Sequence, residues 1–167
     1  MDPNQKKTAL RMIPYGLYVL TAQARDGATA AATVNWVTQA SFEPPLVVVA
    51  VKADSQANAV IQSTQSFALN FLGKGQESVA YAFFKSVECD GQQIGGQRYR
   101  VGTTGSPILE ATPAFVECRV LETVAKGDHT VVVGEVVEAG AGQEPEGRPD
   151  DAVLWLKDLG PRVFYGG

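Results

Sequence analysis

Histidine and cysteine are scarce in this chain of 167 residues, which has one histidine and two cysteines. A structural zinc site usually takes four cysteine or histidine ligands, so Cys89, Cys118 and His129 cannot complete one by themselves. The cysteines lie far apart in the sequence and form no Cys-x-x-Cys pair. We therefore expect no metal site, and two free thiols in a reducing cytoplasm.

Long apolar runs, basic clusters and nucleotide-binding glycine motifs are also missing. No apolar run approaches the ~20 residues of a membrane-spanning helix, and residues 1–10 lack the apolar core of a signal peptide. The 14 basic residues are scattered and the net charge is −4, which argues against nucleic-acid binding. No Gly-x-Gly-x-x-Gly follows a predicted strand, and Gly73-Lys74-Gly75 is not a Walker loop, so a Rossmann or P-loop fold is not expected.

The composition is that of a globular domain, with 45% hydrophobic and 19% charged residues, and we expect one domain over residues 1–167. Asp2-Pro3 begins a helix that Pro14 ends, and further helices are predicted over 56–62 and 76–85. Residues 86–106 form a long loop without clear periodicity, and residues 140–149 an exposed loop. Strands are predicted over 15–24, 29–38, 46–51, 67–72, 115–124 and 129–139, with short terminal strands at 153–156 and 163–165. This pattern predicts a mainly β fold, an antiparallel barrel or closed sandwich with two or three short helices.

Residues 33–52, TVNWVTQASFEPPLVVVAVK, are the most informative stretch. Hydroxyl and amide side chains come first, two prolines follow, and an apolar run fills residues 46–51. Such a β-branched run predicts a strand buried on both faces. Hydrogen-bonding groups beside an apolar wall suit a flat ligand with a polar edge, so our hypothesis is that the stretch binds a flavin. The alternative is that these are ordinary strand-end and turn residues.

Four motifs in order resemble the flavin reductase-like family. The first is Thr-x-Asn-x-x-Thr-x-x-Ser-Phe-Glu-Pro-Pro over residues 33–45. The others are YGLYVLTA (15–22), SFALNFL (66–72), and Gly-Asp-His at 127–129 followed by an apolar strand ending in Gly-Glu-Val (134–136). The resemblance implies an antiparallel, Greek-key, six- to seven-stranded FMN-binding split barrel, as in the small reductase components of two-component monooxygenases. Residues 17–84 are also similar to the flavin reductase-like module of cyanobacterial flavodiiron proteins.

The resemblance implies a flavin site built from two parts of the chain. Asn35, Trp36, Val37 and Thr38 would contact the isoalloxazine ring, and Ser41 the phosphate or ribityl chain. A second group would surround the phosphate at a helix N-terminus, whose free N–H groups and dipole favour anions. That group is Val51, Lys52, Ser55 and Asn58, with Phe84 and Lys85 at the end of the next predicted helix. The alternatives are simple N-capping by Asp54 or Ser55, and a surface lysine.

Two further residues are candidates. Asn70 lies inside an apolar strand, and a buried amide needs partners, so it must bond either the backbone or the cofactor. By resemblance, His129 would lie on the nicotinamide side of the flavin and act there as the catalytic residue. The alternative is a turn histidine paired with Asp128.

The resemblance implies an NAD(P)H:flavin oxidoreductase that binds FMN, with FAD as the alternative flavin. The family's members are usually homodimers, and reduced flavin would pass to a partner oxygenase or another electron acceptor. A second hypothesis is a flavin-binding electron-transfer module without its own NAD(P)H site. A third is a split barrel that has lost flavin and binds another group, such as haem.

Overall fold

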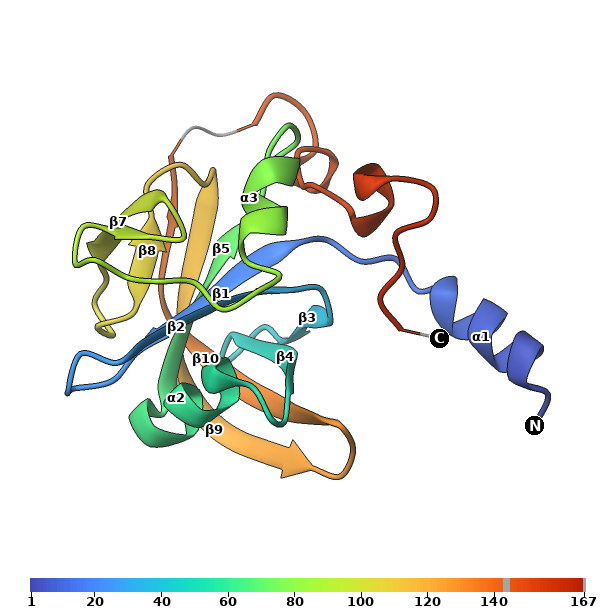
Figure 1. Cartoon of the computed structure of the whole chain (residues 1–167), viewed down its shortest axis with the longest axis horizontal. Helices are drawn as coiled ribbons and strands as arrows, with labels where there is room; N and C mark the ends of the chain where they lie inside the picture. The colour runs from blue at the N-terminus through green and yellow to red at the C-terminus, as the bar shows by residue number, and fades with distance from the viewer. Residues whose placement is uncertain (143–144, 167) are drawn as a thin grey trace.

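The computed structural model describes residues 1–142 and 145–166. Within these residues, a seven-stranded antiparallel sheet and a three-stranded sheet are accompanied by three α-helices and two 3-10 helices (Figure 1). The large sheet has the order β2-β1-β5-β9-β10-β4-β3. Its strands are β1 (Tyr18–Gln23), β2 (Thr29–Val34), β3 (Val37–Ser41), β4 (Leu46–Lys52), β5 (Ser66–Phe71), β9 (Ala114–Ala125) and β10 (His129–Ala141). The predicted mainly β, antiparallel architecture is confirmed.

Residues 29–38 form two strands, so the prediction of one continuous strand was wrong. β2 pairs with β1, whereas β3 pairs with β4 at the opposite edge of the sheet order. The chain crosses between these edges at Asn35 and Trp36, and the backbone N–H of Ala50 in β4 donates to the carbonyl of Trp36 at 3.0 Å. The crossing brings β2 close to β4 and curls the sheet on itself. Asn35 and Trp36 therefore lie where β2 approaches β4, next to the opposite edge of the sheet.

β4 is buried on one face rather than on both, which corrects the prediction made from its apolar run. Val49 and Val51 are buried, whereas Val48 and Ala50 on the opposite face are half-buried. The β-branched residues predicted the strand correctly. They could not predict how much of its outer face other elements cover.

The hydrophobic core consists of two separate clusters of buried residues. α2 (Gln56–Thr64) contributes Ala57, Val60 and Ile61 to the first cluster, where they pack with residues of β1, β4 and β5. α3 (Glu77–Ala82) covers the second cluster, which contains Leu17, Leu72, Phe83 and Leu154. Both helices agree with prediction, although α3 ends three residues before the predicted boundary at Lys85. Although the two helices belong to different parts of the core, residues at the start of α2 and residues just after α3 line the same cleft.

The predicted loop over residues 86–106 contains regular structure. β6 (Gln93–Ile94) and β7 (Gln97–Val101) form a hairpin, and β8 (Pro107–Leu109) pairs with β7 to complete the small sheet. Periodicity does not predict this pairing, because glycines and polar residues dominate the hairpin; Ile94 is buried in the core and Tyr99 packs against it. The predicted exposed loop 140–149 begins later, because β10 extends to Ala141; residues 143–144 of that loop lie outside the described residues.

The C-terminal region lacks the two predicted strands. Val153 and Trp155 make only isolated bridges, to Gly73 and Gly16 respectively. The 3-10 helix η1 (Pro149–Asp151) precedes them, η2 (Leu156–Leu159) follows them, and residues 163–165 have no regular structure. The C-terminal segment is therefore irregular, and isolated bridges connect it to Gly16 and Gly73.

α1 (Pro3–Arg11) begins as predicted, with the Asp2 carboxylate accepting from the backbone N–H of Gln5 at 2.8 Å. None of its residues is buried, and the helix projects from the body of the domain next to the C-terminal segment (Figure 1). Among the residues that the structure describes, no helix has the length and apolar character needed to cross a membrane.

Candidate functional site

A cleft of about 760 Å³ opens where β2 and β4 meet the start of α2, the segment after α3 and the C-terminal segment. Seven residues selected from the sequence line it: Asn35, Val51, Lys52, Ser55, Phe84, Lys85 and His129. They come from segments that are far apart in the chain. The fold therefore gathers most of the predicted site in one place.

The first turn of α2 forms one wall of this cleft. Ser55 is its N-cap: the hydroxyl accepts from the backbone N–H of Asn58 at 3.2 Å and donates to the carbonyl of Lys52 at 2.7 Å. Simple N-capping, one of the alternatives considered from the sequence, is therefore present, and the capping residue is Ser55 rather than Asp54. The first turn itself contains no acidic residue, so its dipole favours an anion, while Asp54 just before the cap adds a negative charge to the same cleft. Lys52 and Lys85 add positive charge to the same cleft.

Asn35 supplies a polar group that the protein itself leaves unsatisfied. The residue is only 6% exposed, and its amide nitrogen Nδ2 has no hydrogen-bond partner within residues 1–142 and 145–166. A buried donor without an acceptor costs about 1–3 kcal/mol. A ligand in the cleft with acceptor atoms along one edge would remove that cost.

His129 lies at the other wall, between two hydrogen-bond partners. Its Nδ1 is 2.8 Å from the Asp128 carboxylate, and its Nε2 is 2.8 Å from the hydroxyl of Tyr165. The imidazole side chain is 13% exposed, and the Trp36 ring lies 4.5 Å from it between centroids. The hydrogen bond from His129 and its charge lower the pKa of Asp128, and burial raises the pKa of Tyr165. The turn pairing with Asp128 is therefore present, and it coexists with a place in the cleft.

The C-terminal side of the cleft was missed in the sequence. Val163, Phe164 and Tyr165 line it, and sequence periodicity had placed them in a short strand. The only local signal was a pair of aromatic residues just after Gly160-Pro161. Their contacts join distant parts of the chain, so periodicity could not have found them.

Asn70 does not reach the cleft, which corrects its selection as a cofactor-binding residue. Its side chain is fully buried, and its amide nitrogen donates to the Val19 carbonyl at 3.1 Å and to the Thr21 hydroxyl at 3.2 Å. Its carbonyl oxygen accepts from the backbone N–H of Leu109 at 2.8 Å. The amide links β5 to β1 and β8. Asn70 therefore bonds the protein itself rather than a cofactor.

Other selected residues also lie outside the cleft of a single chain. Val37 packs on the core, and the exposed Thr38 donates its hydroxyl to the Gln39 carbonyl at 3.1 Å. Asn58 is tied to the Ala53 carbonyl through its amide nitrogen at 2.9 Å, and its Oδ1 has no partner in the described part of the chain. The selected residues that do not line the cleft are Trp36, Val37, Thr38, Ser41, Asn58 and Asn70, of which Trp36 touches it through His129 and Tyr165.

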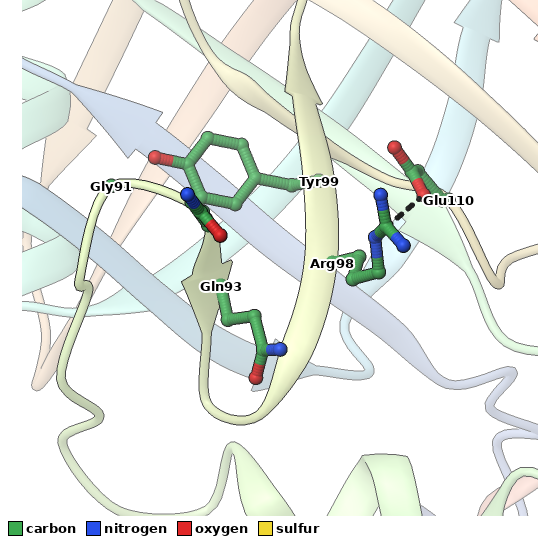
Figure 2. Close-up of a pocket in the computed structure, with 6 residues that line it drawn as sticks. Gly91, Gln93, Arg98, Tyr99 and Glu110 are labelled. Atoms are coloured by element: carbon green, nitrogen blue, oxygen red, sulfur yellow. Dashed lines mark ion pairs between the residues drawn. The ribbon is translucent and has the colours of Figure 1, made fainter.

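A second, smaller cavity of about 460 Å³ lies on the small sheet (Figure 2). Figure 2 shows Arg98 turned toward Glu110, and these side chains pair at 3.5 Å. The cavity contains none of the residues selected from the sequence. The larger cleft is therefore the candidate site.

Comparison with known proteins agrees with the fold and with the sequence motifs. The model of the flavin reductase like domain matches residues 10–160. The chain is 30% identical over 167 residues to a flavin reductase of Pseudomonas putida, covering 100% of this chain and 91% of that protein. It is 33% identical over 137 residues to diflavin flavoprotein A 1 of Synechocystis, covering 81% of this chain and 24% of the relative. An NADH:FMN oxidoreductase of Rhodococcus erythropolis is 29% identical over 141 residues, covering 84% and 71%.

Solved structures show the same architecture. The styrene monooxygenase flavin reductase of Pseudomonas putida S12 matches with a TM-score of 0.72 and 27% identity, covering 85% of this chain and 88% of that one. An NADH:FAD oxidoreductase of Streptomyces globisporus matches with a TM-score of 0.72 and 26% identity, covering 85% and 86%.

These matches establish the class of the protein. The chain belongs to the flavin reductase-like domain family, and its fold is the split barrel that the motifs implied. Its relatives include reductases named for NADH with FMN or FAD. The chain spans about a quarter of the length of the Synechocystis relative and less than half of a probable flavin reductase of Rhizobium meliloti, of which it covers 42%.

Proposed function

We propose that this protein is an NAD(P)H:flavin oxidoreductase, built as a single domain that binds FMN in the 760 Å³ cleft. One observation carries the proposal: the cleft of a flavin reductase-like domain brings together a buried donor without a partner among the described residues, the N-terminus of α2 and a histidine. The bound flavin would supply the chemistry, since it accepts hydride from a reduced nicotinamide. The protein would bind and orient the two reactants.

The residues present fit a flavin. Its ring carries acceptor atoms along one edge, and Asn35 offers its Nδ2 donor, which has no partner in residues 1–142 and 145–166. The side chain of Val51 supplies apolar surface in the same cleft. For the phosphate we propose the backbone N–H groups at the start of α2, together with Lys52 and Lys85. One anion site favours FMN, with FAD as the alternative flavin.

The nicotinamide would approach from the side of His129, which the fold holds between Asp128 and Tyr165. Hydride transfer between the two rings requires no acid or base from the protein. We therefore expect loss of the imidazole to slow the reaction through poorer orientation without abolishing it. NADH and NADPH are both candidates.

We also propose a homodimer. Phe42 follows β3 and is 90% exposed, the outward face of β4 is only half-buried at Val48, and α1 buries none of its residues. Apolar surface of this kind is typical of an interface. A second copy on this edge would offer Val37, Thr38 and Ser41 the flavin contact that the resemblance implies. A monomer by light scattering at micromolar concentration would contradict this part.

Reduced flavin would serve a partner oxygenase or another electron acceptor, in line with the relative named for styrene monooxygenase. We place the protein in a reducing cytoplasm. Cys89, which is exposed, and Cys118, which is buried, are both free thiols in the structure, as that compartment favours.

Steady-state kinetics test the proposal. We expect the purified protein to oxidise NADH or NADPH at a rate that depends on added FMN. A tightly bound flavin that neither nicotinamide reduces would favour the electron-transfer module instead. A colourless protein that fails to quench FMN fluorescence would overturn flavin binding and favour a barrel that binds another group.

A further inference from the structure

The C-terminal segment, residues 163–166, closes one side of the cleft although it lies beyond the residues that the family model matches. It has no regular secondary structure. Arg11 in α1 holds it from outside: its Nε donates to the Gly166 carbonyl at 3.3 Å, and its guanidinium lies 4.2 Å from the centre of the Phe164 ring. Tyr165, which lies between Phe164 and Gly166, lines the cleft.

Asp128 and Tyr165 form hydrogen bonds with the two ring nitrogens of His129. A carboxylate only accepts hydrogen bonds, so the Nδ1 atom facing Asp128 at 2.8 Å carries the proton. In the neutral ring Nε2 is then the acceptor, and the Tyr165 hydroxyl donates to it at 2.8 Å. Two hydrogen bonds on the two ring nitrogens determine the ring's rotation as well as its tautomer.

Packing alone would leave that rotation less well defined. The Trp36 ring meets His129 at a tilt of 49°, and the Tyr165 ring meets it edge-on at 84° with centroids 5.8 Å apart. Both contacts would survive if only the Tyr165 hydroxyl were removed. That hydroxyl is therefore the group whose loss would release Nε2 without emptying the space around the ring.

We propose that Tyr165 is a positioning residue, whose hydroxyl holds Nε2 of His129 and so presents the imidazole to the nicotinamide side of the cleft. The kinetic consequence rests on the function proposed above, whereas the hydrogen bond itself does not. The residue acts through His129 and makes no chemical step of its own. The C-terminal segment thereby becomes part of the reductase site.

Two measurements on Tyr165→Phe test the proposal. His129 is the only histidine, so its ring ¹⁵N signals identify themselves in the spectrum of the whole protein. At pH about 8.5, where an ordinary imidazole is neutral, we expect the Nε2 signal of the variant to move toward that of a nitrogen without a hydrogen bond. In kinetics we expect kcat/KM for the nicotinamide to fall about fivefold, the amount typical of one lost hydrogen bond, while the FMN dissociation constant stays within twofold.

Tyr81→Phe is the matched control. The Tyr81 hydroxyl donates to the Leu159 carbonyl at 3.0 Å, and the residue is 47% exposed against 46% for Tyr165. We expect neither the Nε2 signal nor the kinetics to change in this variant. An unmoved Nε2 signal in Tyr165→Phe would overturn the proposal, and so would a moved signal with unaltered kcat/KM in an active enzyme. If the unmodified protein oxidises no nicotinamide, the proposed function fails, and the NMR arm still decides whether Tyr165 holds His129.

Discussion

The ammonium group of Lys52 lies 3.2 Å from the carboxylate of Asp54 beside the start of α2. Both side chains are largely exposed, at 61% and 76%, so the pair contributes little to stability. Both residues line the cleft in which we place the flavin phosphate. A negative charge thus accompanies the positive one at this position, and Asp54 should weaken anion binding rather than assist it.

Asp54→Asn should therefore bind FMN about threefold more tightly, because surface charge effects of this kind amount to about 0.5–1 kcal/mol. Fluorescence titration with FMN measures the change, and the gain should shrink at high salt as the charges are screened. Asp150→Asn is the matched control, since Asp150 pairs with Arg148 on the surface outside the cleft. Weaker FMN binding in Asp54→Asn would place the phosphate elsewhere.

Lys85→Met should weaken FMN binding about fivefold and riboflavin binding hardly at all. Lys85 is exposed, so its loss should leave the fold unaffected, and riboflavin lacks only the phosphate that the lysine would attract. Parallel titrations with the two ligands measure the difference, with Lys74→Met as control because Lys74 is also exposed and lies outside the cleft. An equal loss for both ligands would show that Lys85 does not contact the phosphate.

Asn35→Leu should keep or raise the stability of the unliganded protein while lowering FMN affinity about tenfold. Leucine has a similar size, and the change removes a buried amide nitrogen that has no partner in the described part of the chain. Urea unfolding and FMN titration on the same preparation separate the two effects. A clear loss of stability with intact FMN binding would make Asn35 a core residue and contradict its place in the site.

Glu117→Ala should destabilise the fold by about 3 kcal/mol without acting on the flavin site. The Glu117 carboxylate is fully buried and accepts from the backbone N–H groups of Thr103 and Thr104 and from the Thr104 hydroxyl, at 2.7–3.0 Å. Removing the carboxylate leaves these donors without an acceptor, and a hydrogen bond to a charged acceptor contributes about 1.5–3 kcal/mol. Urea unfolding measures the loss, and Glu122→Ala, exposed on the same strand, serves as control. A change of less than 1 kcal/mol would mean that water replaces the carboxylate.

Much of the fold could be predicted because local chemistry and tertiary structure agree. The β-branched run gives β4, and Ser55 caps α2 as expected of a serine before a helix. Residues 29–38 contain no glycine or proline at which to end a strand, so the break at Asn35 and Trp36 follows from closure of the barrel alone. No local pattern encodes that closure.

The site was predicted to the extent that family motifs cover it. His129 lies in the Gly-Asp-His motif, and Ser55 lies at the predicted start of a helix. Both residues line the cleft. Asn70 shows the limit, because a buried amide looks the same whether its partners are backbone or ligand. Tyr165 shows another limit, since its role depends on a contact with His129 across 36 positions of the chain.

Anaerobic reduction of FMN by the purified protein tests the central claim most directly. Protein, FMN and NADH or NADPH are mixed without oxygen, and the visible absorbance of the flavin is followed. We predict that the flavin band bleaches with at least one nicotinamide, far faster than in a mixture without protein. A band that persists with both nicotinamides, yet bleaches when dithionite is added, would contradict the assignment as an NAD(P)H:flavin oxidoreductase.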